Sequence, residues 1–304
     1  MNHAPLELAL RLLRAESSGN FPQAWPQLTM LLPHLLAAVD HARFIDPTDD
    51  TAVLLGRAAH CLHIQGHLAQ ARELMERALT IAETLYGLDH PERASRLSYL
   101  ALIVSSLNLP DSAQPMAEQA LAITEKTFGP DHPNVAVCLH TLATIVEDRN
   151  DLPAAMSIAE RALAIIEAHY GSDHPSVSIY LNKVAIILTN LDQAETALPL
   201  AERSLAIAEA AHTVDHYLVG ACDNVLAIVL ADLDRLEAAL PFSERALAAA
   251  QATFGADHPS VATLRDNLAL LGRAGNGLNK DIVGGEGGGG AGGEVEADQG
   301  GGGG

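Results

Sequence analysis

The tripeptide Asp-His-Pro recurs at a fixed step of 42 residues, and this period constrains the fold more than any other feature of the chain. It occupies residues 89–91, 131–133, 173–175 and 257–259, and the remaining step carries Asp-His-Tyr at residues 215–217. A second triplet keeps the same step and ends in Leu79, Leu121, Leu163, Leu205 and Leu247. Self-similarity of this kind is typical of a solenoid, in which each unit buries its apolar face against its neighbours. We therefore expect a long binding surface rather than a catalytic pocket.

The 42-residue unit is predicted to be a hairpin of two helices. Apolar residues recur in it at helical spacing, for example at Leu97, Leu100, Ala101 and Val104. The first helices of the hairpins, called helices A, are predicted near residues 51–65, 93–107, 135–149, 177–190, 219–232 and 260–271. The second helices, called helices B, are predicted near residues 69–85, 111–127, 153–169, 195–211 and 237–253. Stacking of these hairpins gives an all-α solenoid.

Two kinds of turn separate the predicted helices. The short turn after helix A carries a residue that tolerates a left-handed backbone, at Gly66, Asn108, Asn150, Asp192 and Asp234. The longer turn begins with an aromatic residue and a glycine that ends helix B. We expect the Asp of Asp-His-Pro to cap the next helix A and the proline to lie in its first turn. The fourth long turn has His212, Thr213 and Tyr217 in place of the aromatic residue, the glycine and the proline, so we expect a less tightly specified joint there.

Three regions are predicted along the chain. Residues 1–49 form an N-terminal helical cap and a degenerate repeat, with helices near 5–16 and 27–43 and with Pro33 inside the second. Residues 50–272 form the array, with five full repeats and a capping helix. Residues 273–304 form a glycine-rich acidic tail, which we expect to be disordered because it buries too little surface to offset its chain entropy.

Composition narrows the range of partners and compartments. The net charge of −20 argues against nucleic acid and anionic membranes as partners, since both need a cationic face. No apolar run approaches the roughly 18–20 residues of a membrane span, and the first residues do not resemble a signal peptide. Cys61, Cys138 and Cys222 are expected to be reduced core thiols, which favours a cytoplasmic location.

Small residues recur in the array at a spacing of twelve and then seven residues, where helices are expected to cross closely. They are Ala59, Ala71, Ala78, Ala101, Ala113, Ala120, Ala143, Ala155, Ala162, Ala185, Ala197, Ser204, Ala227, Ala239 and Ala246. This spacing resembles the tetratricopeptide repeat. The 42-residue step and the Gly-x-Asp-His-Pro turn resemble its longer-helix variant, found in kinesin light chains and many bacterial relatives. The resemblance implies a right-handed superhelix of antiparallel helix hairpins whose concave groove binds a protein or peptide.

A second resemblance concerns the segment before the array. The run Trp-Pro-Gln-Leu at residues 25–28, with the residues up to 42, is similar to the lead-in to the repeats of bacterial regulators that carry an NB-ARC-type ATPase domain. The chain has no Gly-x-x-x-x-Gly-Lys-Ser/Thr phosphate loop, so any ATPase activity would have to reside on another chain.

The tetratricopeptide resemblance implies which side chains face the groove. Residues three before the central alanine of each helix A include Ser98, His140, Asn182 and Asn224. Asparagine can donate and accept at once, so Asn182 and Asn224 would suit the backbone of an extended peptide.

Five further residues complete the predicted partner-binding set. Ile186 and Ile228 would offer apolar contact to the side chains of the ligand, and Glu147 lies one turn after the central alanine. Lys183 and Asn267 belong to the pairs Asn-Lys and Asp-Asn, which partly match the asparagine pair of kinesin-light-chain-like repeats. The alternative is that all these residues are ordinary solvated or half-buried helix positions.

The sequence predicts neither catalytic, metal nor cofactor sites. Equivalent Asp-His pairs in stacked repeats are separated by at least a helix diameter, on the order of 10 Å, whereas zinc ligands lie within about 2.3 Å of one ion. We expect a non-catalytic module that binds a peptide or protein. The alternative is a sensor or regulatory segment of a signalling ATPase whose nucleotide-binding domain is absent from this chain. The last helix could also mediate self-association.

Overall fold

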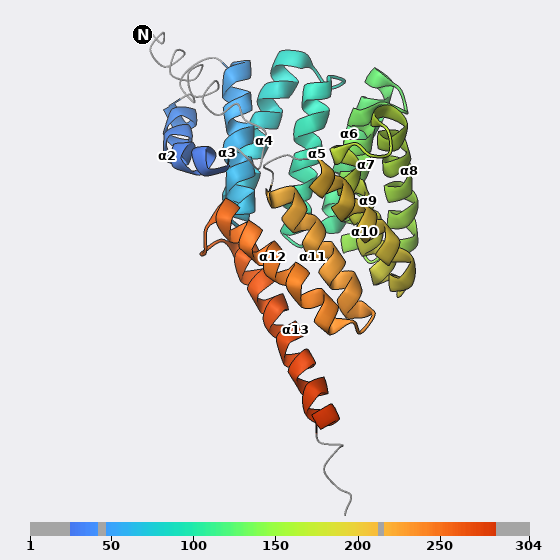
Figure 1. Ribbon diagram of the computed structural model, residues 1–304. Coiled ribbons are helices and arrows are strands. Elements are labelled where there is room, and N and C mark those ends of the chain that lie inside the picture. Colours follow the sequence, from blue (N-terminus) through green and yellow to red (C-terminus); the bar gives the residue numbers. More distant parts are fainter. Residues whose placement is uncertain (1–24, 42–46, 212–215, 284–304) are drawn as a thin grey trace, which may run out of the picture.

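The computed structural model describes residues 25–41, 47–211 and 216–283, with side chains described for residues 30–41, 47–211 and 217–272. Twelve helices and no strand occur in this part of the chain (Figure 1). Helices A are α3 (Asp49–Ile64), α5 (Pro91–Ser106), α7 (Pro133–Asp148), α9 (Pro175–Asn190), α11 (His216–Asp232) and α13 (Pro259–Val283). Helices B are α4 (Leu68–Tyr86), α6 (Pro110–Phe128), α8 (Leu152–Tyr170), α10 (Ala194–Ala210) and α12 (Leu236–Phe254). The predicted bounds are confirmed to within three residues, apart from the end of α13.

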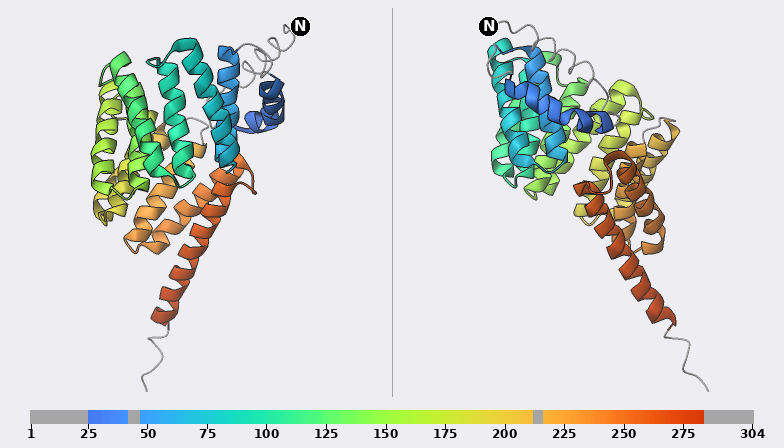
Figure 2. Two further views of the ribbon diagram at one scale, coloured as in Figure 1. Left: turned by 180° about the vertical axis from the view of Figure 1, so that it is seen from behind. Right: turned by 90° about the vertical axis from the view of Figure 1, so that its left-hand side faces the viewer.

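The helices stack as a right-handed solenoid whose first and last helices lie close together. Helices α5, α7, α9 and α11 each pack on the helix B that follows and on the helix B before, whereas α3 packs on α2 and α4 and α13 packs on α12. Helices A also pack on one another, α5 on α7, α7 on α9 and α9 on α11, so they form the inner layer of the curve. The stack from α3 to α8 turns back through α9 to α12, which brings the start of α13 beneath α3 (Figures 1 and 2).

Several predictions concern segments at the edges of this array. Helix α2 (Trp25–His41) precedes the array, contains Pro33 and packs on α3. Helix α13 continues to Val283, beyond the end predicted near residue 271, and leads away from the array (Figure 2). The predicted helix near 5–16, the fourth long turn at residues 212–215 and residues 284–304 of the predicted tail lie outside the described residues.

The short turns have the predicted left-handed backbone. The φ angle is 79° at Gly66 and between 58° and 65° at Asn108, Asn150, Asp192 and Asp234. Side chains of most residues clash in this conformation, whereas glycine has none and Asn and Asp tolerate it. The choice of these residue types therefore fixes the sharp reversal between helices A and B.

The long turns correct one prediction, because the capping atom belongs to histidine and not to aspartate. In His90, His132, His174 and His258 the ring Nδ1 accepts the backbone N–H of the residue two positions later, at 3.1–3.2 Å. The aspartate before each histidine is exposed. Proline begins each of these helices A, as predicted, because its fixed φ suits the first helical position and its missing N–H needs no partner there.

Stacking explains why the imidazole takes this role. Each capping ring lies against the aromatic residue four positions earlier, with centroids 4.5–4.6 Å apart and planes within 21° in the pairs Tyr86–His90, Phe128–His132, Tyr170–His174 and Phe254–His258. The glycine between them has a φ of 85–89°. Helix end, ring stack and helix start thus form one local unit, an aromatic-glycine-histidine clamp.

The predicted columns of small residues are confirmed as helix crossings. Every residue of the three columns is at most 3% exposed. Side chains of alanine size let two helix backbones approach closely, and the surrounding leucine, isoleucine and valine side chains fill the remaining space. Cys61, Cys138 and Cys222 are buried and free, in agreement with the expectation for core thiols.

Candidate binding groove

The main groove of the described residues lies on the inner layer formed by helices A. It has a volume of about 840 Å³ and runs from α3 across α5 and α7 to α9, with Met75, Thr124 and Phe128 of helices B below it. This volume falls within the 300–1,000 Å³ or so of pockets that hold ligands of drug size. The groove is open along its length, which suits an extended segment of polypeptide.

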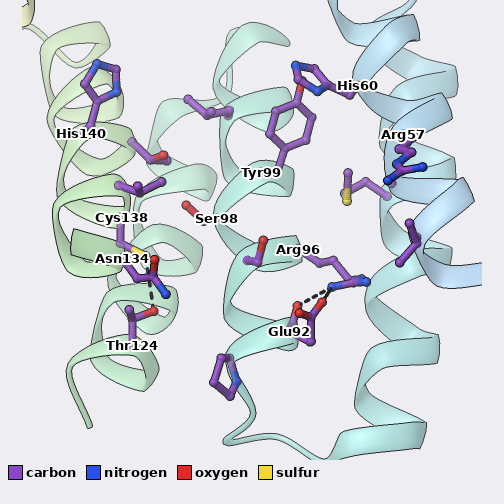
Figure 3. Close-up of a pocket in the computed structure, with 18 of the residues that line it drawn as sticks. Arg57, His60, Glu92, Arg96, Ser98, Tyr99, Thr124, Asn134, Cys138 and His140 are labelled. Carbon is purple, nitrogen blue, oxygen red and sulfur yellow. Dashed lines mark hydrogen bonds and ion pairs between the residues drawn. The ribbon is translucent and has the colours of Figure 1, made fainter. Parts of the chain in front are cut away.

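Two predicted partner-binding residues line this groove. Ser98 on α5 and His140 on α7 face it from neighbouring hairpins (Figure 3). Gly56, His60 and Leu102, which occupy related positions of helices A, line it as well. The register from the central alanine therefore identified the inner face of α3, α5 and α7.

The remaining predicted residues are not among the residues that line this groove. Asn182 is only 8% exposed, and its Nδ2 donates to the Cys222 sulfur at 3.4 Å. The side-chain carbonyl oxygen of Asn182 is buried and accepts no hydrogen bond from the part of the chain that the structure describes. Asn224 and Asn267 are half-buried on α11 and α13. The structure thus directs Asn182 into the contact between α9 and α11.

Lys183 and Glu147 are paired with each other. The Nζ atom of Lys183 lies 2.9 Å from a carboxylate oxygen of Glu147, and both side chains are less than 15% exposed. The other oxygen of Glu147 accepts from Asn190 at 2.8 Å. These charges therefore join α7 to α9. Ile186 is half-buried, and Ile228 on α11 is 37% exposed.

The sequence analysis missed an apolar stripe in the groove. Val137 on α7 is 55% exposed and Ile179 on α9 is 46% exposed, and both line the groove. They occupy the same repeat position, six residues before the central alanine, as does Val53 on α3. The equivalent residue of α5 is Ser95, so β-branched side chains occupy this position in three of the four helices A that line the groove, and this recurrence could have identified them. Exposed apolar side chains in a concave surface are typical of an interaction site.

Polar groups at the α3–α5 side of the groove were also missed. Arg57 and Arg96 both lie at this side, and His140 lies across the groove on α7 (Figure 3). Arg96 is buried, donates to the backbone carbonyl of Glu92 at 2.9 Å and forms an ion pair with its carboxylate. Tyr99 contacts His60 edge to face and accepts or donates a hydrogen bond with His63 at 2.9 Å.

The groove histidines are neutral at pH 7. Burial, with a smaller effect of neighbouring His63, lowers the pKa of His60 to about 4. Burial and the charge of Lys183 lower the pKa of His140 to about 4 as well. Burial raises the pKa of Tyr180 to about 12, so this groove residue keeps its hydroxyl proton. The histidine and tyrosine side chains therefore act as neutral hydrogen-bonding groups.

Among the residues that the structure describes, no group of three or more His, Cys, Asp or Glu side chains gathers as metal ligands would. No helix in the described part of the chain is long and apolar enough to cross a bilayer.

Comparison with known proteins identifies the class of fold. Tetratricopeptide repeat family matches cover residues 50–126, 110–168, 179–217 and 218–276. These matches span most of the chain, and the chain belongs to the tetratricopeptide repeat family. No curated protein matches it in sequence.

Solved structures that share this fold belong to proteins of different kinds. A putative kinesin light chain with nearly identical TPR-like repeats from Podosopora anserina is 23% identical, with a TM-score of 0.50, and the match covers 66% of this chain and 95% of that one. NprR in complex with its cognate peptide NprX is 15% identical, with a TM-score of 0.65 and coverage of 89% and 72%. A Signal Transduction ATPase with Numerous Domains (STAND) with a tetratricopeptide repeat sensor, from Pyrococcus horikoshii, is 18% identical, with a TM-score of 0.57 and coverage of 81% and 35%.

Proposed function

We propose that this chain is a non-catalytic interaction module of the cytoplasm that binds a peptide segment of a partner in the groove of helices A. The observation that carries the proposal is the exposed apolar stripe of Val137 and Ile179 in a concave surface that also presents polar side chains. An extended peptide places alternate side chains on opposite sides, so it can contact this stripe with every second residue.

Hydrogen-bonding groups beside the stripe suit the peptide backbone. Ser98, Asn134 and the neutral His140 line the groove next to Val137. Each of these side chains can donate or accept, which is what an extended main chain requires. Asn224, Ile186, Ile228 and Asn267 belong to the proposal as an extension of the same face along α9, α11 and α13. Asn182, which contacts Cys222, and the ion pair of Lys183 with Glu147 would brace this face from within.

Replacement of the stripe tests this proposal directly. The parent chain is screened against an arrayed library of random dodecapeptides, and the selected peptides are measured by fluorescence anisotropy. The double variant Val137→Asp with Ile179→Asp is expected to weaken binding at least tenfold, since burying two carboxylates beside apolar ligand groups is unfavourable. The matched control is Leu88→Asp, which changes an exposed apolar residue outside the groove and should leave affinity unchanged. Equal binding by parent and double variant would refute the groove assignment.

A second candidate role is a sensor segment of a signalling ATPase system. The observation in its favour is the fold shared with the STAND protein's tetratricopeptide repeat sensor over 81% of this chain. In that role the array would contact a nucleotide-binding domain on another chain. Co-expression with NB-ARC-type ATPases encoded beside this gene tests it: a stable complex whose ATP hydrolysis changes with the array would support the role, and the absence of any complex would count against it.

A further inference from the structure

The two ends of the array contact each other, although they are far apart in sequence. Helix α2 packs against α12, so the segment before the first repeat contacts the fifth helix B. A Cβ atom placed on Gly66, in the turn between α3 and α4, would lie 3.8 Å from Cγ of Pro259 at the start of α13. The views in Figures 1 and 2 agree that α13 begins directly beneath the lower end of α3.

This contact explains a departure from the repeat pattern. The left-handed residue of the short turn is Asn or Asp in four hairpins and glycine only at Gly66. A Cβ atom alone would be in ordinary van der Waals contact with Pro259, so the additional atoms of Asn or Asp would have to find room beside the proline ring. Glycine permits the left-handed turn and adds no side-chain atom to the end-to-end contact.

The end-to-end contact closes the curve of helices A on which the groove lies. Helices A form the inner layer of the curve, and the groove lies on α3, α5, α7 and α9. When the first hairpin meets the last helices, the curve of inner faces makes a complete turn (Figures 1 and 2). An extended peptide is narrow enough to lie on these faces inside the turn, whereas a folded domain would need the turn to open.

We propose that the contact of α2 and the Gly66 turn with α12 and Pro259 is a clasp that holds the array closed and selects short extended peptides over folded partners. The clasp refines the proposed function, because it concerns access to the same groove. A turn and one helix crossing form a much smaller contact than the stacked hairpins on either side, so this contact is where the curve can open first. A ligand that binds the closed state better than the open state shifts the population toward the closed one.

A distance measurement between the two ends tests the clasp without any ligand. Cysteines introduced at the exposed positions His67 and Ser260 carry spin labels, and the native cysteines react slowly because they are buried. Double electron–electron resonance on the full chain should give one short and narrow distance distribution. A long or broad distribution in the otherwise native chain would overturn the clasp.

The variant Gly66→Asn should open the clasp. Asn108 and Asn150 show that the turn accepts asparagine at this position, so folding is expected to be unchanged by circular dichroism. The distance distribution should become longer and broader, because the new side chain meets Pro259. The matched control Asn108→Gly changes the same turn position in the middle of the array and should leave the end-to-end distance unchanged. A native distribution in Gly66→Asn would refute the clasp.

A second variant and a binding measurement complete the test. Pro259→Ala removes the contacting ring atoms without adding any and should broaden the distribution in the same direction. If Gly66→Asn leaves about one tenth of the molecules closed, its apparent affinity for a selected groove peptide falls about tenfold. Should the parent bind no peptide while both variants lengthen the distance, the proposed function fails and the clasp stands.

Discussion

The joints with complete clamps and the unit around α10 and α11 hold the same fold together by different chemistry. At four joints a glycine ends helix B and a histidine ring, stacked on an aromatic residue, caps the next helix A. Helix α10 lacks this ending: it stops at Ala210, two residues shorter than the other helices B. The difference teaches that the local turn chemistry and the inter-helix core can vary independently in a solenoid, since each unit contacts only its neighbours.

The core of this unit differs as well. One position of helix A holds a buried leucine in four repeats, at Leu55, Leu97, Leu139 and Leu181, and none of them is more than 4% exposed. The corresponding residue of α11 is Asp223, which is 1% exposed. Its carboxylate lies 3.1 Å from Nε of Arg245, which also pairs with Glu209, while the other carboxylate oxygen has no partner among the described residues. An ion pair between a buried carboxylate and a half-exposed guanidinium thus replaces apolar packing.

Placing a carboxylate at the equivalent position of a regular repeat should have the largest effect on the free energy of unfolding. In Leu181→Asp a fully buried leucine becomes a carboxylate. Arg203 lies at the repeat position of Arg245 and pairs with Glu167 as Arg245 pairs with Glu209, but its side chain is 37% exposed and compensates the new charge only in part. We expect the free energy of unfolding to fall by about 3–5 kcal/mol, because apolar packing is lost and a carboxylate is buried with incomplete compensation. Urea denaturation measures the loss. The control Ile179→Asp, on the exposed face of the same helix, should cost no more than about 0.5 kcal/mol. A loss below about 1 kcal/mol in Leu181→Asp would show that the position is not a core position.

Replacing Asp223 by the leucine of the other repeats should instead raise the free energy of unfolding. Asp223→Leu is expected to raise the free energy of unfolding by about 1–2 kcal/mol at pH 7, because the buried carboxylate carries a desolvation cost that a leucine side chain does not. Arg245 keeps Glu209 as a partner in the variant, which limits the cost of removing Asp223. A destabilised variant would mean that the pair is worth more than the packing it replaces.

The pH dependence of the stability difference between the parent and Asp223→Leu tests the buried carboxylate independently. Burial raises the pKa of Asp223 from 3.8 to about 6; Arg245 opposes the rise and Glu209 adds to it. Because the folded pKa exceeds the unfolded value, the folded chain binds more protons between these two pH values, and the contribution of Asp223 to stability falls as pH rises from about 4 to about 6. The stability advantage of Asp223→Leu should therefore be small at pH 4 and reach its full size above pH 6. A difference between parent and variant that stays constant with pH would contradict the raised pKa.

The sequence predicted the array because its information is periodic. The helix bounds, the left-handed turn residues such as Asn108 and Asp192, and the small-residue columns all repeat at 42 residues. Features that occur once were not predicted. The pair Lys183–Glu147 and the buried Asp223 have no counterpart in the other repeats, so only the packing of neighbouring helices reveals their partners.

The candidate site was predicted in part for a related reason. The register placed Ser98 and His140 on the inner face, and both line the groove. It also placed Asn182 there, but that side chain is 8% exposed, donates to Cys222 and does not line the groove. Register gives the face of a helix, whereas the packing of the next helix A decides how far a side chain on that face is covered. The stripe of Val137 and Ile179 lies one helical turn before the positions of His140 and Asn182.

The smallest effect on stability is expected at the aromatic-glycine-histidine clamp. Its two parts, the helix cap and the ring stack, can be separated by mutation. His132 caps α7 through Nδ1 and stacks on Phe128. The variant His132→Ala loses both interactions and should lower the free energy of unfolding by about 1–2 kcal/mol. In His132→Asn the side-chain oxygen can still cap the helix, because asparagine is among the best capping residues, so only the stack is lost. We expect this variant to recover at least half of the loss, measured by thermal and urea denaturation. Equal losses in the two variants would show that the ring stack, and not the cap, stabilises the joint.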